Sequence, residues 1–272
     1  MKILVTGHAG MIGHEVLSLL KRSGHCVTGF DCLSSYEEWE QRFDEFSKSI
    51  QPVDLIVHVG AVVDANVPSI DNETELWEMN YLATKRLGAY AKAQGSKFLF
   101  FSSYAAKEPQ TPYGWGKRVA EDVLKLTLPK NDLCIFRPLV VWSFNEKNKR
   151  GPSIVYKILS QQLEFVYANW IRDCVHVSDV ARAVNSVADK WMHGTYEIGT
   201  GKEIEIEALV REIYEHLPDS FEMPEVITSP LSYNYAVADP DNMLPGWQPK
   251  YEGDDLPALL AGAMQGMAHD NM

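Results

Sequence analysis

The sequence contains few cysteines and no long apolar run. Its 272 residues include only four cysteines, with neither a CxxC pair nor metal-finger spacing: Cys26, Cys32, Cys134 and Cys174. We therefore expect free thiols, no metal site and a reducing, cytoplasmic setting. No run of about 18 uncharged apolar residues is present, which argues against a transmembrane helix. The opening residues MKILVTG resemble a strand rather than a secretory signal.

Basic residues are also scarce. The chain has 25 Lys and Arg against 37 Asp and Glu, which gives a formal net charge of −12. Nucleic-acid binding needs a basic face, so this charge argues against such a partner. Apolar residues make up 46% of the chain, enough for a sizeable core. The length suits one large α/β domain, or a dinucleotide-binding domain with a small added lobe.

Short apolar runs alternate with helix-like stretches through the first half of the chain. This alternation predicts βαβ crossovers and a parallel sheet covered on both faces. We expect strands at residues 2–6, 25–30, 55–59, 98–101 and 133–136, and helices at 11–23, 37–50, 74–94 and 114–128.

The alternation of strands and helices weakens after about residue 140, where Pro and aromatic residues become frequent. We therefore predict a Rossmann-type doubly wound parallel sheet with a small C-terminal lobe. Residues 1–140 would form the sheet domain, with a segment at about 171–200 returning to it. Residues 141–272 would mainly form the substrate-binding lobe.

A glycine-rich loop follows the first expected strand. Gly7, Gly10 and Gly13 have the spacing GxxGxxG, and Met11 and Ile12 open the next helix. The chain must turn sharply, bring backbone N–H groups against a pyrophosphate and pack the helix tightly on the sheet, and each demand favours glycine. The helix N-terminus would then face the phosphates. The alternative is a glycine-rich turn without a ligand.

Asp31 follows the second expected strand, 18 residues beyond Gly13. A carboxylate near this spacing accepts hydrogen bonds from the adenosine ribose hydroxyls and repels a 2′-phosphate. No Lys or Arg follows it closely. The sequence therefore favours NAD over NADP as the cofactor, which makes residues 1–140 the NAD-binding domain, although Asp31 could also be a turn residue.

Tyr113 and Lys117 lie four residues apart at the start of an expected helix, and hence on one face. A neighbouring ammonium lowers the pKa of a phenol, which can then exchange a proton while hydride moves to or from a nicotinamide. Ser103 ends the preceding strand, where a hydroxyl could hydrogen-bond a reacting oxygen. Ser102 is the competing candidate for that role.

These motifs resemble the extended short-chain dehydrogenase/reductase family, the NAD-dependent epimerases and dehydratases. The resemblance extends along nearly the whole chain. Further similar segments are His58–Ala61 for H-x-A-A, Asn80–Thr84 for N-x-x-G-T, Arg137–Pro138 for R-P, Arg172–Ala181 for R-D-x-x-H-V-x-D-V-A, Tyr196–Gly201 for Y-N-x-G-x-G, and Gly246–Pro249 for G-W-x-P. Gly60 stands in place of an Ala in the first of these, and Ala83 stands where Gly is usual in the second.

The resemblance implies roles for individual residues. Tyr113 would be the general acid/base, Lys117 would bind the nicotinamide ribose and tune Tyr113, and Ser103 would orient the reacting oxygen of the substrate. Cofactor contacts are implied for Gly7, Gly10, Met11, Ile12, Gly13, Asp31, His58, Gly60, Ala61, Asn80, Tyr113, Lys117 and Pro138. The resemblance also implies a homodimer formed through two long helices.

Arg172 would contact a substrate diphosphate, to which a guanidinium fork is well suited. The alternative is a structural ion pair with Asp173 or Asp179. His176 and Asp179 are expected to join the substrate segment to the sheet rather than to take part in the reaction.

The chain departs from the family pattern at several points. Only nine residues, 104–112, separate Ser103 from Tyr113, where over twenty are usual, so we expect a more open substrate pocket. Residues 232–239 contain no second Arg for a diphosphate. The acidic residue that reads adenine is hard to place, and Asp44 is the candidate.

The predicted function is that of an NAD-dependent nucleotide-sugar epimerase. A dehydratase is disfavoured because Tyr104, Ala105 and Ala106 stand where an acid/base pair is needed. One alternative is an NAD(P)H-dependent reductase or dehydrogenase of a keto-sugar or small carbonyl compound. The other is a non-catalytic NAD-binding regulatory protein, although such relatives usually lose the Tyr or the Lys.

Overall fold

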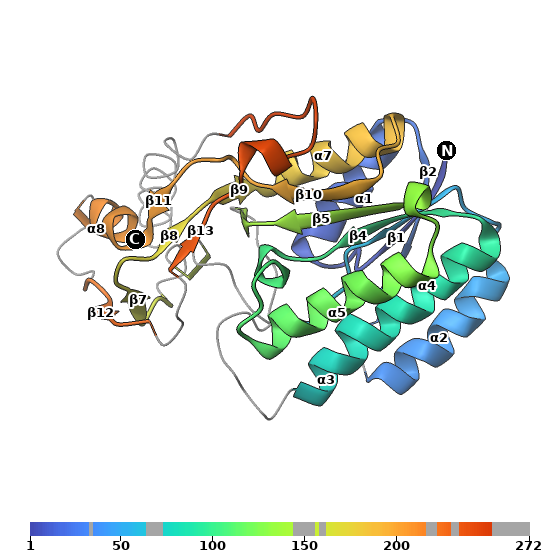
Figure 1. Ribbon diagram of the computed structural model, residues 1–272, viewed down its shortest axis with the longest axis horizontal. Helices are drawn as coiled ribbons and strands as arrows, with labels where there is room; N and C mark the ends of the chain where they lie inside the picture. Colours follow the sequence, from blue (N-terminus) through green and yellow to red (C-terminus); the bar gives the residue numbers. More distant parts are fainter. Residues whose placement is uncertain are drawn as a thin grey trace, which may run out of the picture.

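The computed structural model describes residues 1–32, 35–63, 73–143, 156–157, 162–215, 222–229 and 234–251. A six-stranded sheet with strand order β10-β5-β4-β3-β1-β2 forms its centre, and every neighbouring pair is parallel. Figure 1 shows helices on both faces of this sheet. The sheet strands are β1 (Lys2–Thr6), β2 (Cys26–Phe30), β3 (Leu55–His58), β4 (Lys97–Phe101), β5 (Leu133–Pro138) and β10 (Gly194–Ile198). The expected doubly wound α/β fold is confirmed.

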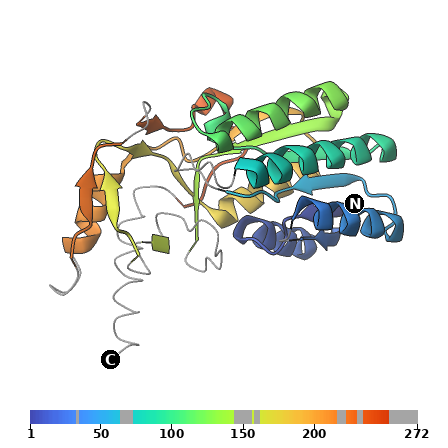
Figure 2. The ribbon, with the colours of Figure 1, turned by 90° about the horizontal axis from the view of Figure 1, so that it is seen from below.

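The helices form one layer on each side of the sheet, as Figure 2 shows from below. The first layer contains α1 (Met11–Arg22) and α7 (Val177–Asp189), and the second contains α2 (Tyr36–Ser49), α4 (Ala83–Gln94) and α5 (Pro112–Thr127). Alternate strand residues pack into the two layers: Val57 faces α1 and α7, whereas Ile56 faces the other three helices. This alternation follows from the period of two along a strand.

The connection from β2 to β3 consists of the single helix α2. In the order 3-2-1-4-5-6 a further strand lies outside the second one, but here β2 is the edge strand of the described sheet, and β10 extends the opposite side. This arrangement accounts for the compact stretch between Asp31 and Leu55. The strand order reverses beside β1, and ligands bind at the carboxyl ends of the strands at such a point.

A single helix over residues 74–94 was expected, and the helical run there contains a local distortion. Helix α3 (Glu73–Trp77) continues into a π-helical turn, η2 (Glu78–Leu82), and then into α4. Such turns widen the helix by one residue and often occur at functional sites. Asn80 lies within the turn and is fully buried.

A smaller lobe lies beside the carboxyl ends of the large sheet, at the left in Figure 1. Helix α8 (Ile206–Glu215) packs there with Trp142, Val166 and Trp170 around a separate apolar cluster. Its strands pair as β6 with β9, β7 with β12, and β8 with β11 and β13. They are β6 (Val140–Trp142), β7 (Phe165–Tyr167), β8 (Ile171–Arg172), β9 (Cys174–His176), β11 (Ile204–Glu205), β12 (Glu225–Ile227) and β13 (Tyr235–Ala236).

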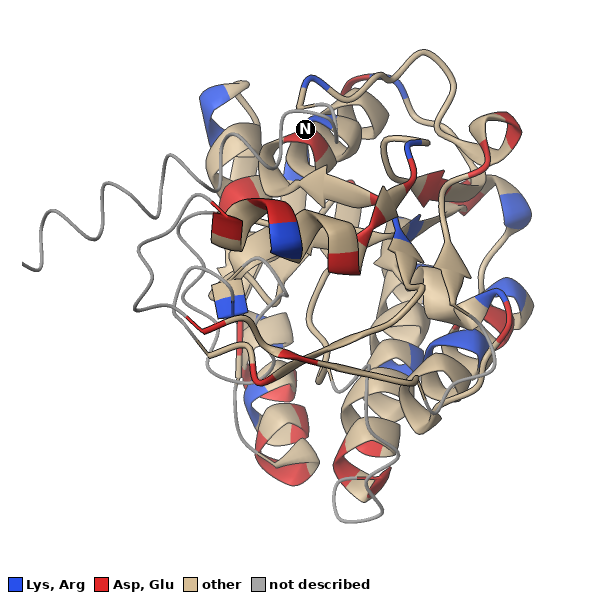
Figure 3. Ribbon diagram, turned by 90° about the vertical axis from the view of Figure 1, so that its left-hand side faces the viewer, with Lys and Arg blue, Asp and Glu red and all other residues tan. Residues whose placement is uncertain are grey.

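We propose that the lobe begins near residue 140, because β5 is the last strand before the chain leaves the large sheet. Figure 3 faces this lobe and shows acidic segments on α8, whose sequence carries three Glu and one Arg. No helix in the described ranges has both the length and the apolar character needed to cross a membrane.

Candidate active site

The glycine loop joins the end of β1 to the start of α1. Gly7 has a φ of +75°, and a Cβ there would lie 2.4 Å from the backbone of Gly60. A Cβ on Gly13 would lie 2.1 Å from the carbonyl oxygen of Gly7. Both positions therefore require glycine on steric grounds. The loop can follow this tight path only because two backbones meet without side chains between them.

Gly10 serves a different purpose. It is the N-cap of α1, and no side chain caps the helix there. A Cβ on Gly10 would come no closer than 3.5 Å to the Gly7 carbonyl oxygen. The N-terminus of α1, with Met11, Ile12 and Gly13 in its first turn, thus fits the diphosphate of a dinucleotide, whose anionic groups bind at such helix ends.

Asp31 lies beside this loop, directly after β2. Its Oδ2 accepts a hydrogen bond of 2.8 Å from the backbone N–H of Ala9. The carboxylate therefore braces the loop in addition to the ribose role that its position predicts. Asp44, the candidate for adenine recognition, lies on α2 instead and forms an ion pair with Arg86 at 2.5 Å.

His58 ends β3 and is buried between β1 and α4. Its Nδ1 lies 2.7 Å from the Thr6 hydroxyl, and its Nε2 lies 2.8 Å from the Thr84 hydroxyl. Burial, together with the nearby charge of Lys117, lowers the pKa of His58 to about 3. The ring is therefore neutral, and its predicted cofactor contact would act through the backbone that it positions.

Asn80 fixes the loop that follows β3. Its Oδ1 accepts from the Val62 N–H at 2.9 Å, and its Nδ2 donates to the Val62 carbonyl oxygen at 2.8 Å. The π turn is what carries this side chain to the loop containing Gly60 and Ala61. Asn80 thus positions a predicted cofactor segment from a neighbouring helix.

Tyr113, Ser103 and Lys117 converge at the end of β4. Pro112 and the Thr111 cap start α5, so Tyr113 lies in its first turn. The Tyr113 hydroxyl hydrogen-bonds Ser103, whereas the Ser102 hydroxyl turns away and donates to Glu121 at 2.6 Å. Of the two competing serines, Ser103 is therefore the one that faces the phenol.

Lys117 is buried, with 2% of its surface exposed. Its Nζ donates to the Phe101 carbonyl oxygen at 2.8 Å and lies 5.0 Å from the centre of the Phe100 ring. Burial lowers the pKa of Lys117 to about 7 even though Glu121 raises it. Burial therefore disfavours the ammonium form of Lys117, and the charge of Glu121 favours it.

The phenol behaves differently from the sequence expectation. Burial raises the pKa of Tyr113 to about 12, and the hydrogen bond with Ser103 is the influence that lowers it. The structure thus holds Tyr113 as a protonated phenol, ready to donate. Pro138, another predicted cofactor contact, ends β5 at the same edge of the sheet and pairs with Ile198 of β10.

The short connection after Ser103 is attached to the rest of the protein by an ion pair. Lys107 Nζ lies 2.7 Å from Glu197 Oε1, and that carboxylate is only 4% exposed. Its Oε2 accepts from the Asp239 N–H at 2.9 Å. A cavity of about 280 Å³ lies between this connection and β13, lined by Tyr104, Ala105, Lys107, Glu108, Asn234 and Tyr235.

Arg172 lies in the small lobe, apart from the other predicted site residues. Its guanidinium donates to the carbonyl oxygens of Ile171 and Asn234, both at 2.8 Å, and stacks on Trp170 at 3.9 Å. Only 7% of Arg172 is exposed. These contacts anchor β8 to the segment before β13. Of the stretch expected to lack a second Arg, residues 232 and 233 lie outside the described residues.

Asp173 and Asp179 act as buried anchors. Asp173 accepts from the backbones of Thr200, Gly201 and Ala238. Asp179 pairs with Arg182 and accepts from the N–H groups of Lys250 and Tyr251 at 3.0 Å each. Asp173 therefore ties together the segments at 200–201 and 238, and Asp179 ties α7 to the segment at 250–251. The joining role of His176 and Asp179 stays a prediction.

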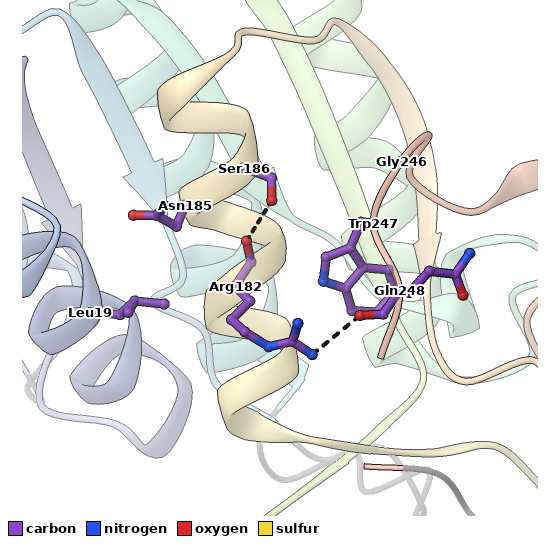
Figure 4. A pocket seen from close by; sticks show the side chains of 7 residues that line it. All are labelled: Leu19, Arg182, Asn185, Ser186, Gly246, Trp247 and Gln248. Atoms are coloured by element: carbon purple, nitrogen blue, oxygen red, sulfur yellow. Dashed lines mark hydrogen bonds between the residues drawn. The ribbon is translucent and has the colours of Figure 1, made fainter. Parts of the chain in front are cut away.

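A second cavity, of about 290 Å³, lies beside α1 and α7 and is shown in Figure 4. There Arg182 donates to the Gln248 carbonyl oxygen at 3.2 Å. The cavity is lined by Leu19, Arg182, Asn185, Ser186, Gly246, Trp247 and Gln248. These contacts attach the C-terminal segment to α7, away from the predicted reacting groups.

Sequence reasoning missed several residues that shape the site, namely Thr6, Lys107, Glu121 and Glu197. It named Thr84 and Arg137 as motif residues without giving either a role. The spacing of Glu121 offered a signal, because it lies four residues beyond Lys117 and eight beyond Tyr113 on one helix. The described residues contain no cluster of His, Cys, Asp and Glu able to hold a metal ion.

Residues 3–199 match the model of the NAD dependent epimerase/dehydratase family. The chain belongs to this family, and it is an NAD-dependent enzyme of the epimerase/dehydratase type. Among its relatives is a Methanocaldococcus jannaschii protein named "Putative UDP-glucose 4-epimerase", which is 27% identical over 79% of this chain and 81% of that protein.

Solved structures share the fold along almost the whole chain. The UDP-glucose 4-epimerase of Thermus thermophilus, in complex with NAD, has a TM-score of 0.76 at 23% identity, covering 98% of this chain and 99% of that one. A dTDP-4-dehydrorhamnose reductase of Clostridium acetobutylicum has a TM-score of 0.75 at 17% identity, covering 98% and 100%. At these identities the likeness shows the fold alone.

Proposed function

We propose that this protein is a nucleotide-sugar epimerase in which Tyr113, Ser103 and Lys117 assist hydride transfer to and from NAD. The convergence of these three side chains at the end of β4 carries the proposal. They lie at the same edge of the sheet as the glycine loop, where a doubly wound sheet binds its ligand. The relative named for UDP-glucose 4-epimerase activity favours a UDP-sugar.

Each residue has a defined task in this reaction. NAD, when bound at the glycine loop, would supply the hydride acceptor and donor for this chemistry. As a sugar C–H gives up hydride, Tyr113 Oη takes the proton of the hydroxyl on the same carbon, which leaves a keto group. In the return step both transfers are reversed, and the hydride is added to the opposite face of the keto-sugar. The Ser103 hydroxyl, already hydrogen-bonded to Tyr113, orients the sugar oxygen.

Lys117 would supply the positive charge that makes the phenolate accessible. The pKa of Tyr113 is raised to about 12 by burial, so removal of its proton needs a nearby cation. Lys117 lies one helical turn away on the same helix face. Its buried position makes an ammonium effective there, because charges interact more strongly away from water.

Two assays test the proposal. Protein purified as expressed would be denatured and the released nucleotide identified by mass spectrometry. The intact protein would then be incubated with NAD and UDP-, GDP-, dTDP- or CDP-sugars, and the products separated. We expect bound NAD and interconversion of a UDP-hexose with its 4-epimer. Retained NAD without epimerisation of any of these sugars would contradict the proposed function.

Reduction of a keto-sugar is a second candidate, favoured by the protonated state of Tyr113. A phenol with its pKa raised to about 12 stays protonated at neutral pH, so it carries a proton that a carbonyl oxygen can take up as hydride arrives. The nine-residue connection between Ser103 and Tyr113 also leaves room for an open pocket. Consumption of NADH with a 4-keto-sugar nucleotide, without epimerisation, would support this reaction.

We also propose a homodimer formed through the long helices on one face. Trp115 and Leu126 on α5 are 56% and 87% exposed and lie eleven residues apart, about three turns along the same helix face. Trp77 on α3 is 45% exposed. Light scattering should give twice the chain mass, and Trp115→Glu should reduce it to that of a monomer.

A further inference from the structure

Helix α5 holds the end of β4 at three successive residues. Tyr113 bonds Ser103, Lys117 bonds the carbonyl oxygen of Phe101, and Glu121 accepts from the hydroxyl of Ser102 at 2.6 Å. Side chains four residues apart share one helix face. The proposed acid/base, the proposed cation and a buried carboxylate therefore form a single row along the strand end.

Glu121 is the member of this row without a role in the proposed reaction. It is 0% exposed, and Arg137 holds it through two hydrogen bonds, 2.8 Å to Oε1 and 2.6 Å to Oε2. A carboxylate buried so completely is costly unless it is paired and hydrogen-bonded. Both of its oxygens are engaged, so its orientation is fixed.

We propose that Glu121 is a positioning residue for the reaction: it fixes the strand end through Ser102 and supplies the buried negative charge that keeps Lys117 an ammonium. This inference rests on the proposed function, in which Lys117 acts as the cation. Glu121 does not touch the reacting atoms. It acts through Lys117 on one side and through the Ser102–Ser103 backbone on the other.

The charges around this row are consistent with that role. Burial lowers the pKa of Lys117, and Glu121 raises it. From β3, His58 faces Lys117 as a neutral ring. From β5, Arg137 faces Glu121, and from the next turn of α5, Lys125 approaches it at 3.3 Å. Glu121 is thus the described carboxylate that offsets the desolvation of Lys117.

The proposal is tested by titrating Lys117 directly in the NAD-loaded protein. Lysine labelled with ¹³C and ¹⁵N would be followed by heteronuclear NMR between pH 5 and 10 (with Lys117→Arg to assign the signal). In Glu121→Gln, which keeps the shape but loses the charge, we expect the Lys117 midpoint to move toward acid. The proton affinity should fall about tenfold. An unchanged midpoint would overturn the inference.

Two further variants separate charge from position. Ser102→Ala removes the hydrogen bond and keeps the charge, so the Lys117 midpoint should stay while turnover of UDP-glucose falls equally at every pH. In Glu121→Gln the loss of turnover should grow as pH rises, because Lys117 loses its proton earlier. Equal losses across pH in both variants would reduce Glu121 to a structural residue and overturn the inference.

The matched control is Asp122→Asn, which neutralises the neighbouring residue of the same helix. Asp122 is 55% exposed and pairs with Arg118, so the Lys117 midpoint should not move. If Glu121→Gln does not fold, Glu121→Asp keeps the charge and should titrate like the native protein; an acid shift there would overturn the inference. A shifted midpoint in Glu121→Gln, together with no turnover of UDP-glucose by the native protein, would count against the proposed substrate alone.

Discussion

The cofactor side and the substrate side of the site are held in place by different kinds of contact. Around the glycine loop, backbones touch directly: a Cβ on Gly7 or Gly13 would lie 2.4 or 2.1 Å from main-chain atoms. Asp31 and Asn80 add side-chain hydrogen bonds on this side. On the substrate side, the contacts described are those of polar side chains. Lys107 tethers the short connection to Glu197, and Arg172 bonds two backbone carbonyls of the small lobe.

This difference has a physical consequence. A backbone contact cannot be relieved by a change of rotamer, so the cofactor side tolerates almost no added atoms. A polar contact such as an ion pair can be replaced by another polar pair, because losing it costs only the small free energy that the original pair contributed. The same fold can therefore keep one dinucleotide site while its substrate side changes, which matches the intact cofactor motifs and the shortened loop of this chain.

The largest effect is expected where the two sides meet, at Tyr113. Tyr113→Phe removes the proton carrier, so kcat should fall by about a thousandfold. NAD content should stay the same, since the lost hydroxyl bonds Ser103 rather than the glycine loop. Turnover of UDP-glucose and the released nucleotide would be measured together. Tyr90→Phe, on α4 outside the site, is the control, and a similar loss in that variant would remove Tyr113 from its proposed role.

A methyl group in the glycine loop should be next in size. Gly13→Ala places a Cβ against the Gly7 carbonyl oxygen. The strain should lower the free energy of unfolding by about 3 kcal/mol, and the variant should also lose NAD binding. Gly10→Ala has only an ordinary contact within the protein, so it should fold like the native chain. Urea unfolding and NAD titration compare the two. Equal stability would show that the loop can move, and the contrast between the two sides would fail.

Burial of His58 should make the cofactor side sensitive to acid. Its pKa is lowered from 6.5 to about 3 in the folded protein, so between these values the unfolded chain binds a proton that the folded chain does not. Stability should therefore fall as pH drops below 6.5, by up to about 1.4 kcal/mol per pH unit. Urea unfolding of the native protein and of His58→Gln at pH 7, 6 and 5 measures the difference. Parallel pH profiles would show that another group carries the effect.

The smallest effect is expected on the substrate side, from Glu197→Gln. The amide still accepts from the Asp239 N–H but releases Lys107, which is 34% exposed and can be solvated. A loss of about 0.7 kcal/mol of substrate-binding free energy would raise KM for UDP-glucose about threefold. We expect kcat and NAD affinity to stay unchanged. Glu207→Gln on α8 is the matched ion-pair control. A fall in NAD affinity would show that the two sides are coupled.

The sequence was sufficient to predict most of the fold. The starts of strands β1 to β5 and of helices α1 and α2 lie within one residue of their expected positions, because apolar periodicity and glycine or proline boundaries are local signals. The π turn at Glu78–Leu82 was not predictable in this way. It depends on the contacts of Asn80 with Val62, two segments that pack together only in the folded chain.

The site was predictable in part for the same reason. The positions of Ser103, Tyr113 and Lys117 follow from short spacings along the chain. The engagement of Arg172 with Trp170 and Asn234 and the pairing of Glu121 with Arg137 do not. Composition gives 37 acidic residues, and only the folded packing decides that Glu121, Asp173 and Asp179 are among those with 0% exposure.

The row of contacts along α5 also sets the helix register. A slip of one residue would rotate every side chain by about 100° and shift it by about 1.5 Å. The bonds to Phe101, Ser102 and Ser103 would then all be lost together. Correct registration of this helix and assembly of the proposed catalytic centre therefore occur together. A chain with α5 out of register would lack all three contacts and would have no partly formed site.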